Sequence, residues 1–248
     1  MPFALSSGFK IYYEVEGAGP PLVLLHGSGM DGASWRHFGY VSRLKASYQV
    51  ILIDARGHGR SDKPHDPVRY SLRNRAEDVV AVLDALKIGK SAAFGYSMGG
   101  WTSLGLIKYA PGRFSAIVAG ATHPYARSFE FARRAYLAGL DRWVAGLDKA
   151  FRDRTPAVRK SLLANDVAAL IASHGDRPAI EGLEKLVSMP CLLLIGAADP
   201  VFPETLRFHQ ETSETTLISL PGRDHLGAFL DDETATSHIK DFLAAALT

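Results

Sequence analysis

The apolar residues of this chain fall into short runs, and glycine or polar residues follow each run. Leu22–Leu25, Val50–Ile53 and Cys191–Ile195 are wholly apolar, which is typical of strands in a parallel sheet that is covered on both faces. Ala116–Ala119 is a further short apolar run, and Thr216–Leu220 alternates apolar with polar residues. These runs predict the strands of one sheet, together with an early strand over residues 10–14.

Helical spacing appears between these runs. Leu72, Ala76, Val79 and Leu83 recur at intervals of three and four residues, Ser71 is a typical N-cap, and we expect Gly89 to end the helix. Further helices are predicted over residues 34–44, 102–109, 178–187, 203–209 and 232–247. Strands that alternate with helices predict parallel strands joined by right-handed crossovers, and hence an α/β fold with a doubly wound, mostly parallel sheet.

The alternation stops between about Pro124 and Asp176, where no strand pattern appears. Residues 127–151 and 156–173 are helical in pattern instead. This stretch is too short for a second domain with its own core, so it predicts a small helical cap over one edge of the sheet. The expected organisation is a core of residues 1–123 and 177–248 with a cap insertion of residues 124–176.

Composition narrows the class of protein. The chain has 248 residues, 47% of them hydrophobic, and a formal net charge of +2, so one large folded domain is expected. Lysine and arginine form no stripe or cluster, which argues against nucleic acid or a membrane surface as a partner. The N-terminus lacks the pattern of a signal peptide, and no apolar stretch is long enough to span a membrane. We therefore expect a cytoplasmic protein, and the sequence does not predict its oligomeric state.

The segment Gly95-Tyr96-Ser97-Met98-Gly99 is a G-x-S-x-G pattern between a predicted strand and a predicted helix. A sharp turn at this place strains the backbone of the central serine and exposes its hydroxyl at the end of the sheet. Side chains two residues before and after the serine would collide in such a turn, so glycine is expected at both places. Backbone N–H groups at the start of the following helix favour a developing negative charge.

A serine hydroxyl is a weak nucleophile at neutral pH, so it needs a base, and the base needs an orienting carboxylate. The expected chain order for a serine on such a turn is serine, acid, histidine, which Ser97, Asp199 and His225 follow. Asp199 and His225 each come just after a predicted strand. Because the carboxyl ends of parallel strands meet at one edge of the sheet, we expect the three side chains to converge there.

Over nearly its whole length the chain resembles the α/β-hydrolase superfamily. The resemblance rests on five motifs in order: His26-Gly27, Asp54-x-Arg56-Gly57-x-Gly59-x-Ser61, Gly95-x-Ser97-Met98-Gly99-Gly100, Gly196-x-x-Asp199-Pro200 and Gly222-x-Asp224-His225. It implies that Ser97 is the nucleophile, His225 the general base and acid, and Asp199 the orienting carboxylate. It also implies an oxyanion hole formed by the backbone N–H groups of Ser28 and Met98.

Other assignments are weaker. Asp224 could replace Asp199 as the acid, but neighbouring side chains on a loop usually point apart. Relatives that open epoxides or remove halides carry aspartate at the turn, where this chain has Ser97. His26, Arg56 and His58 are expected to hold loops through polar contacts. The remaining histidines show no spacing typical of metal ligands, so no metal and no cofactor is expected.

The substrate pocket is expected between the cap and the strand ends. Its candidate walls are Trp35, His123, Tyr125, Trp143, Phe202 and Leu226. An apolar pocket without an evident cationic anchor favours a small to medium neutral ester, cleaved by a carboxylesterase through an acyl-enzyme. Hydrolysis of a C–C bond in ring-cleavage diketones and cofactor-free haloperoxidase or perhydrolase chemistry stay open. A ligand-binding signalling receptor on the same fold is the alternative of another class.

Overall fold

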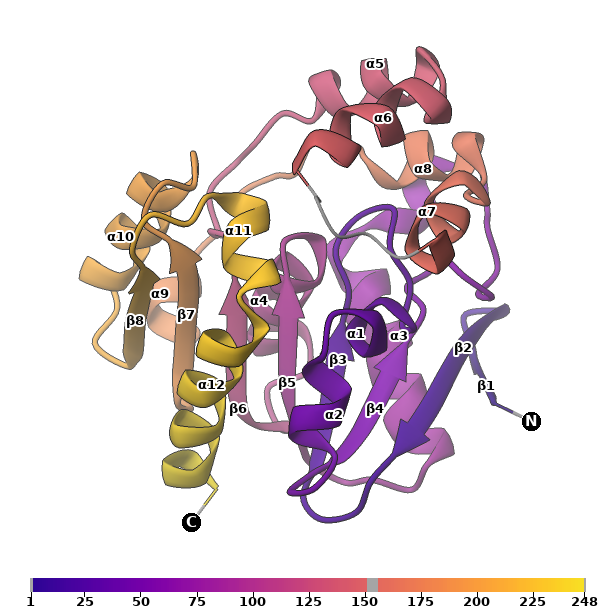
Figure 1. The fold of residues 1–248 in the computed structure, drawn as a ribbon. Helices are drawn as coiled ribbons and strands as arrows, with labels where there is room; N and C mark the ends of the chain where they lie inside the picture. The colour runs from indigo at the N-terminus through magenta and orange to yellow at the C-terminus, as the bar shows by residue number, and fades with distance from the viewer. Residues whose placement is uncertain (1, 151–155, 248) are drawn as a thin grey trace.

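The computed structural model of the chain describes residues 2–150 and 156–247; Phe151, the predicted end of the first cap helix, lies outside them. One sheet has the strand order β1-β2-β4-β3-β5-β6-β7-β8 (Figure 1). Its strands are β1 (Phe3–Ser6), β2 (Phe9–Glu16), β3 (Pro21–Leu25), β4 (Gln49–Ile53), β5 (Ser91–Tyr96), β6 (Phe114–Gly120), β7 (Cys191–Gly196) and β8 (Thr215–Leu220).

The sheet is parallel from β4 to β8 in its spatial order, and β1 and β2 add an antiparallel edge. In register, Leu22 of β3 lies between Val50 of β4 and Ala92 of β5. The predicted doubly wound, mostly parallel sheet is therefore confirmed. Because the parallel strands run in one direction, the loops after β3, β5, β7 and β8 all leave the same edge.

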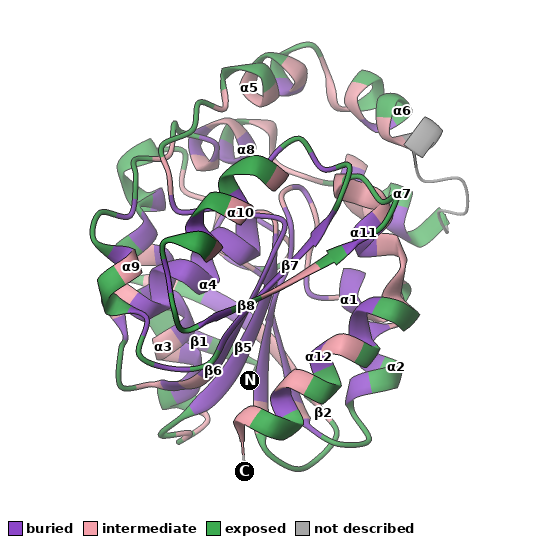
Figure 2. Ribbon diagram, turned by 90° about the vertical axis from the view of Figure 1, so that its left-hand side faces the viewer, coloured by how far each residue is buried: buried purple, intermediate pink, exposed green. Residues whose placement is uncertain are grey.

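Helices cover both faces of the sheet. They are α1 (Ser34–His37), α2 (Tyr40–Leu44), the short 3₁₀ helix η1 (Pro67–Tyr70), α3 (Leu72–Ala85), α4 (Met98–Tyr109), α9 (Leu183–Leu186), α10 (Phe202–Gln210), α11 (His225–Leu230) and α12 (Asp232–Ala246). In Figure 2 the central strands, β3 to β7, are almost entirely buried between these layers. No helix in residues 2–150 and 156–247 is long and apolar enough to cross a bilayer.

The core consists of two apolar clusters, one on each face of the sheet. Val23 and Leu25 of β3 point to the cluster under α3 and α4, while Leu22 and Leu24 point to the cluster under α2, α11 and α12. All four side chains are buried. Full burial of one such side chain contributes roughly 1.5–3 kcal/mol, so this five-residue strand stabilises both layers and fixes the place where its loop begins.

Four helices follow β6: α5 (Glu130–Leu137), α6 (Leu140–Ala150), α7 (Pro156–Leu163) and α8 (Val167–Ser173). They lie above the carboxyl ends of the strands (Figure 1). Val144, Val158 and Leu162 form a small apolar cluster of their own between α6 and α7. The residue bounds of this cap as a separate unit stay a prediction.

Several element predictions were wrong, each for a local reason. The helix over residues 34–44 is split into α1 and α2 by Gly39, which has a φ of +83°. The helix expected from Pro178 is limited to the single turn of α9. Helix α3 ends before Gly89, because Lys87 takes the left-handed conformation with a φ of +58°. The edge strand β1 was not predicted.

The turn between β5 and α4 leaves no room for a side chain at its glycines. A Cβ atom on Gly95 would lie 2.0 Å from the carbonyl oxygen of Gly99, and one on Gly99 would lie 1.9 Å from that of Leu25. Both obstacles are backbone atoms, which cannot rotate away. The predicted need for glycine on either side of Ser97 is therefore confirmed.

We expect Gly99→Ala to lower the free energy of unfolding by more than about 3 kcal/mol, because β3 and α4 must separate to admit the methyl group. Gly112→Ala is the matched control, since a Cβ there meets nothing within 4 Å; it should change stability by less than about 0.5 kcal/mol. Urea denaturation followed by circular dichroism measures both. Equal stabilities of the two variants would contradict this packing argument.

Candidate active site

Ser97 lies at the bend between β5 and α4 with a φ of 56° and a ψ of −108°. This conformation is rare for a residue with a side chain and costs about 1–3 kcal/mol. Two backbone hydrogen bonds hold it: the Ser97 N–H donates to Gly120 over 2.8 Å, and its carbonyl accepts from Trp101 over 3.0 Å. The bend directs the hydroxyl away from the sheet and toward the cap.

His225 and Asp199 reach Ser97 from the loops after β8 and β7. His225 Nε2 lies 3.0 Å from Ser97 Oγ, and His225 Nδ1 lies 2.7 Å from Asp199 Oδ2. The Tyr96 hydroxyl donates to the His225 carbonyl over 2.8 Å and so fixes the backbone that carries the imidazole. The structure thus brings together the three side chains that the sequence suggested.

The proton positions follow from these contacts. A carboxylate only accepts hydrogen bonds, so Nδ1 carries the proton and Nε2 accepts from the Ser97 hydroxyl. Burial alone would raise the pKa of Asp199, but hydrogen bonds from His225 and from the Val201 N–H outweigh it and lower the pKa. Asp199 is therefore ionised at neutral pH and holds the imidazole in one tautomer.

Asp224, the alternative acid, has another task. Its Oδ1 accepts from the Gly227 N–H over 2.7 Å, so it is the N-cap of α11. Its neighbour His225 is the first residue of that helix and points to Asp199 instead. Asp224 fixes the start of the helix that carries His225.

The two predicted oxyanion-hole donors lie beside Ser97. Met98 begins α4, where the first N–H groups of a helix have no partner within it. Ser28 follows β3 on the loop of Gly27, and a Cβ on Gly27 would lie 3.8 Å from Cβ of Ser97. Within the described residues the structure gives neither N–H an acceptor. Their role in stabilising an oxyanion stays a prediction.

A cavity of about 290 Å³ opens over Ser97, between the strand ends and the cap. Its walls are mostly apolar, and residues from both the sheet loops and the cap contribute to them. They are Gly27, Ser28, Met30, Tyr96, Ser97, Phe129, Ala132, Tyr136, Trp143, Leu147, Leu162, His174, His225, Leu226 and Phe229.

A serine on a tight bend, an imidazole held by a carboxylate and an apolar cavity thus meet at one edge of a doubly wound sheet. A family model described as "alpha/beta hydrolase fold" matches residues 20–175. The chain belongs to this family. The family and its relatives indicate a hydrolase that acts on a small molecule.

Individual relatives of this α/β hydrolase include two curated enzymes. The chain is 34% identical over 197 residues to 3-oxoadipate enol-lactonase 1 of Acinetobacter baylyi, covering 73% of this chain and 72% of that protein. It is 31% identical over 211 residues to pimeloyl-[acyl-carrier protein] methyl ester esterase of Aeromonas hydrophila, covering 76% and 80%. Another alignment spans about half the length of the relative it matches.

The fold is also found among solved structures. The crystal structure of a hydrolase from Pseudomonas aeruginosa PA01 superposes with a TM-score of 0.85 at 26% identity, covering 97% of each chain. The similarity therefore extends over the sheet, its helical layers and the cap.

Of the six side chains expected in the pocket, Trp143 and Leu226 line the cavity. Trp143 of α6 lies directly over the loop after β3: a Cβ on Gly29 would be 2.4 Å from its indole ring. Trp35 was placed wrongly, because it faces the sheet. It is fully buried, with the rings of Phe94 and Tyr40 at 4.8 and 5.0 Å.

His123, Tyr125 and Phe202 also do not line this cavity. The His123 ring is buried and its Nδ1 accepts from the Tyr125 N–H over 3.2 Å, which turns it toward its own loop. The Tyr125 hydroxyl donates over 2.5 Å to Glu211, which directly follows α10. Phe202 is the first residue of α10 and is not among the residues that line the cavity. These residues join the cap entry to α10.

Sequence reasoning missed a polar cluster on the cap side of the cavity. Ser28 Oγ lies 2.6 Å from His174 Nε2 and 3.0 Å from the Tyr136 hydroxyl. His174 ends α8 and Tyr136 belongs to α5, so the cluster joins two cap helices to the loop after β3. No motif marks these residues; only an isolated histidine within an apolar helical pattern could have drawn attention to this place.

His174 is held in its neutral form. Burial is the largest cause that lowers its pKa, and the positive charges of Arg177, Arg75 and Arg133 lower it further, to about 3. A hydrogen bond to the Leu170 carbonyl opposes this shift without outweighing it. Two of these arginines also hold the end of α8 in place. Arg75 of α3 donates to the Ser173 carbonyl over 2.9 Å and joins the cap to the core, while Arg133 of α5 donates to the His174 carbonyl over 2.7 Å and joins two parts of the cap.

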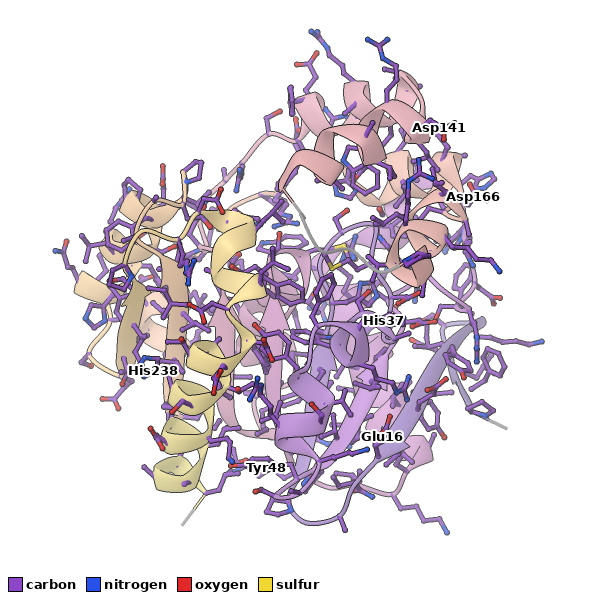
Figure 3. All side chains as sticks on the ribbon, in the orientation of Figure 1. Glu16, His37, Tyr48, Asp141, Asp166 and His238 are labelled. Atoms are coloured by element: carbon purple, nitrogen blue, oxygen red, sulfur yellow. The ribbon has the colours of Figure 1, made fainter. Side chains whose placement is uncertain are left out.

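The other polar residues of the motifs hold loops. His26 Nε2 accepts from the Ala55 N–H over 3.0 Å, and buried Arg56 pairs with Asp78 through two hydrogen bonds. Figure 3 shows His37 and His238 on separate helices, α1 and α12. Among the described residues no group of three or more histidine, cysteine, aspartate or glutamate side chains could hold a metal ion.

We expect His174 to make stability depend on pH. Its pKa is about 3 when folded and near 6.5 when unfolded, so the unfolded chain binds a proton first as the pH falls. The contribution of His174 to the free energy of unfolding is complete above pH 6.5. It is lost as the pH falls toward 3, by up to about 1.4 kcal/mol per pH unit. Urea denaturation between pH 7 and 4.5 should show that the free energy of unfolding falls less for His174→Asn than for the wild type.

The control for this experiment is His37→Asn, because His37 is exposed on α1. It should reproduce the wild-type dependence of unfolding free energy on pH. If His174→Asn also reproduces it, His174 is not buried in its neutral form.

Proposed function

We propose that the protein is a serine hydrolase that cleaves small to medium neutral carboxylic esters through a Ser97-His225-Asp199 triad and an acyl-enzyme. The single observation that carries the proposal is the continuous contact from Ser97 Oγ through His225 to Asp199, at 3.0 and 2.7 Å. This is hydrogen-bond distance at both steps, as general-base activation of a hydroxyl requires.

In the proposed reaction Ser97 Oγ attacks the ester carbonyl while its proton moves to His225 Nε2. The imidazolium is stabilised by Asp199, and the negative oxygen is bound by the N–H groups of Ser28 and Met98. His225 then gives the proton to the leaving alcohol, and an acyl group remains on Ser97. A water molecule activated by the same imidazole releases the acid. One lost donor of such a hole typically costs about 3 kcal/mol of transition-state stabilisation.

The substrate class is supported by the walls of the cavity. Among its described lining residues there is no lysine, arginine, aspartate or glutamate, and the histidines among them are those already described. A volume of about 290 Å³ suits an ester of modest size. Two relatives of the chain are by name an enol-lactonase and a methyl ester esterase, and both names refer to cleavage of an ester bond.

We expect Ser97→Ala to fold normally and to lose hydrolysis of short p-nitrophenyl esters by about 10⁶-fold in kcat, since the nucleophile is removed. A serine-directed fluorophosphonate probe should label the wild type and leave Ser97→Ala unlabelled, as read by intact-protein mass spectrometry. Folded wild-type protein that stays unlabelled would refute the mechanism. One slow burst without steady turnover would favour the receptor alternative.

The two candidate acids can be separated by a matched pair of variants. Asp199→Asn should lower kcat by about 10⁴-fold, because the amide no longer holds the proton on His225 Nδ1. Asp224→Asn should keep activity close to that of the wild type, because asparagine is an equally good N-cap for α11. Steady-state kinetics on one p-nitrophenyl ester measures both, and the reverse order of effects would assign the acid to Asp224.

A further inference from the structure

The polar cluster of Ser28, Tyr136 and His174 is an unexplained feature of a mostly apolar cavity. All three side chains line the cavity over Ser97, and Tyr136 and His174 are buried. Within the described residues their hydrogen bonds run to one another and to the end of α8, and not to the triad. The positions of their protons determine what the cluster can bind.

The histidine proton can be located from its neighbours. Nδ1 of His174 lies 2.9 Å from the Leu170 carbonyl, which only accepts, and 3.1 Å from Ser173 Oγ. The Ser173 hydroxyl donates to the same carbonyl over 2.9 Å, so its oxygen accepts from Nδ1. Nδ1 therefore carries the proton. Because His174 is neutral, Nε2 has a lone pair and accepts.

The two hydroxyl protons then follow in turn. Ser28 must donate to His174 Nε2 over 2.6 Å, since this nitrogen has no proton to give. With its own proton used, Ser28 Oγ accepts from the Tyr136 hydroxyl over 3.0 Å. Every proton of the cluster thus points along one chain, from Tyr136 through Ser28 and His174 to Leu170.

Only acceptor sites remain on the cluster. The Tyr136 oxygen keeps its lone pairs and Ser28 Oγ keeps one, while no proton is left to offer. A hydrogen-bond donor from a ligand adds a bond without breaking one. A ligand that only accepts, such as an ether, would need the Tyr136 proton and would break its bond to Ser28.

We propose that Tyr136 and Ser28 bind a hydroxyl group of the substrate, so that the preferred esters carry a hydroxyl close to the scissile carbonyl. The inference rests on the proposed function in one respect: its kinetic test requires that the protein hydrolyses esters. The substrate hydroxyl must lie close to the scissile carbonyl because Ser28 would contact both groups. Its backbone N–H is the expected donor to the carbonyl oxygen, and its Oγ is roughly 3 Å from that nitrogen. The cluster therefore selects substrates beside the reacting atoms and takes no part in the bond changes.

The test compares matched esters. Ethyl hexanoate, ethyl 3-hydroxyhexanoate as each enantiomer and ethyl 3-methoxyhexanoate vary the acyl side. Ethyl, 2-hydroxyethyl and 2-methoxyethyl hexanoate vary the alcohol side. At least one hydroxy ester should exceed both its unsubstituted and its methoxy counterpart about tenfold in kcat/KM, which is the usual effect of one buried hydrogen bond.

Tyr136→Phe removes one of the two acceptor oxygens and keeps the ring, so it should lower the ratio of kcat/KM between hydroxy and unsubstituted ester. In the double variant Tyr136→Phe/Ser28→Ala, which removes both acceptor oxygens and keeps the backbone N–H of residue 28, this ratio should fall to about one, whatever the absolute rates become. Tyr109→Phe, which removes a phenol hydroxyl outside this cavity, is the matched control and should keep the wild-type ratio. A ratio that survives the double variant, or methoxy esters that match hydroxy esters, would overturn the inference even if the substitutions lower the melting temperature.

A binding measurement separates this inference from the proposed function. Calorimetry with Ser97→Ala should show about tenfold tighter binding of the preferred hydroxy ester than of ethyl hexanoate, without any turnover. Tighter binding combined with a wild type that hydrolyses no ester would refute the hydrolytic function and keep the cluster as a hydroxyl site. Hydrolysis of all esters at equal kcat/KM, with equal binding, would refute the inference and keep the function.

Discussion

The backbone bend at Ser97 is the constraint on which the rest of the site depends. A positive φ on a residue with a side chain is unfavourable, and here it is held by hydrogen bonds from Ser97 to Gly120 and from Trp101 to Ser97. Bare glycine backbone on both sides lets β5, β3 and α4 approach within van der Waals distance. With the hydroxyl fixed at the edge of the sheet, the carboxylate that follows β7 and the imidazole that follows β8 reach it from the same edge.

The sheet could be predicted from the sequence because its strands are buried on both faces and therefore apolar without interruption. The convergence of Ser97, Asp199 and His225 could be predicted because parallel strands bring their carboxyl ends to one edge. The helix ends near Gly39 and Lys87 could not be predicted, because they depend on left-handed backbone conformations that the spacing of apolar residues does not show. The edge strand β1 is only four residues long, and its apolar run, residues 3–5, is shorter than the runs of the buried strands.

The pocket was harder to predict than the triad for a physical reason. Trp35 and Trp143 are both aromatic residues in amphipathic helices, yet one packs under the sheet layer and the other forms a cavity wall. The packing of each helix on its neighbours decides which of its side chains face the core and which face the cavity. This packing is a property of the tertiary structure, so the spacing of residues in the sequence does not show it. His174 illustrates the same limit: its neutral state comes from burial and from arginines, of which Arg75 and Arg133 are distant from it in the sequence.

The contact between Trp143 and Gly29 has a geometrical consequence for the shape of the cavity. At that point the indole rests on bare main chain, and the space between them is smaller than one methyl group. The distance between α6 and the loop after β3 is therefore set at this point by the thickness of an aromatic ring, not by the length of the connecting loops. Substitutions at Trp143 and Gly29 can therefore change the depth of the cavity during evolution while the sheet stays as it is.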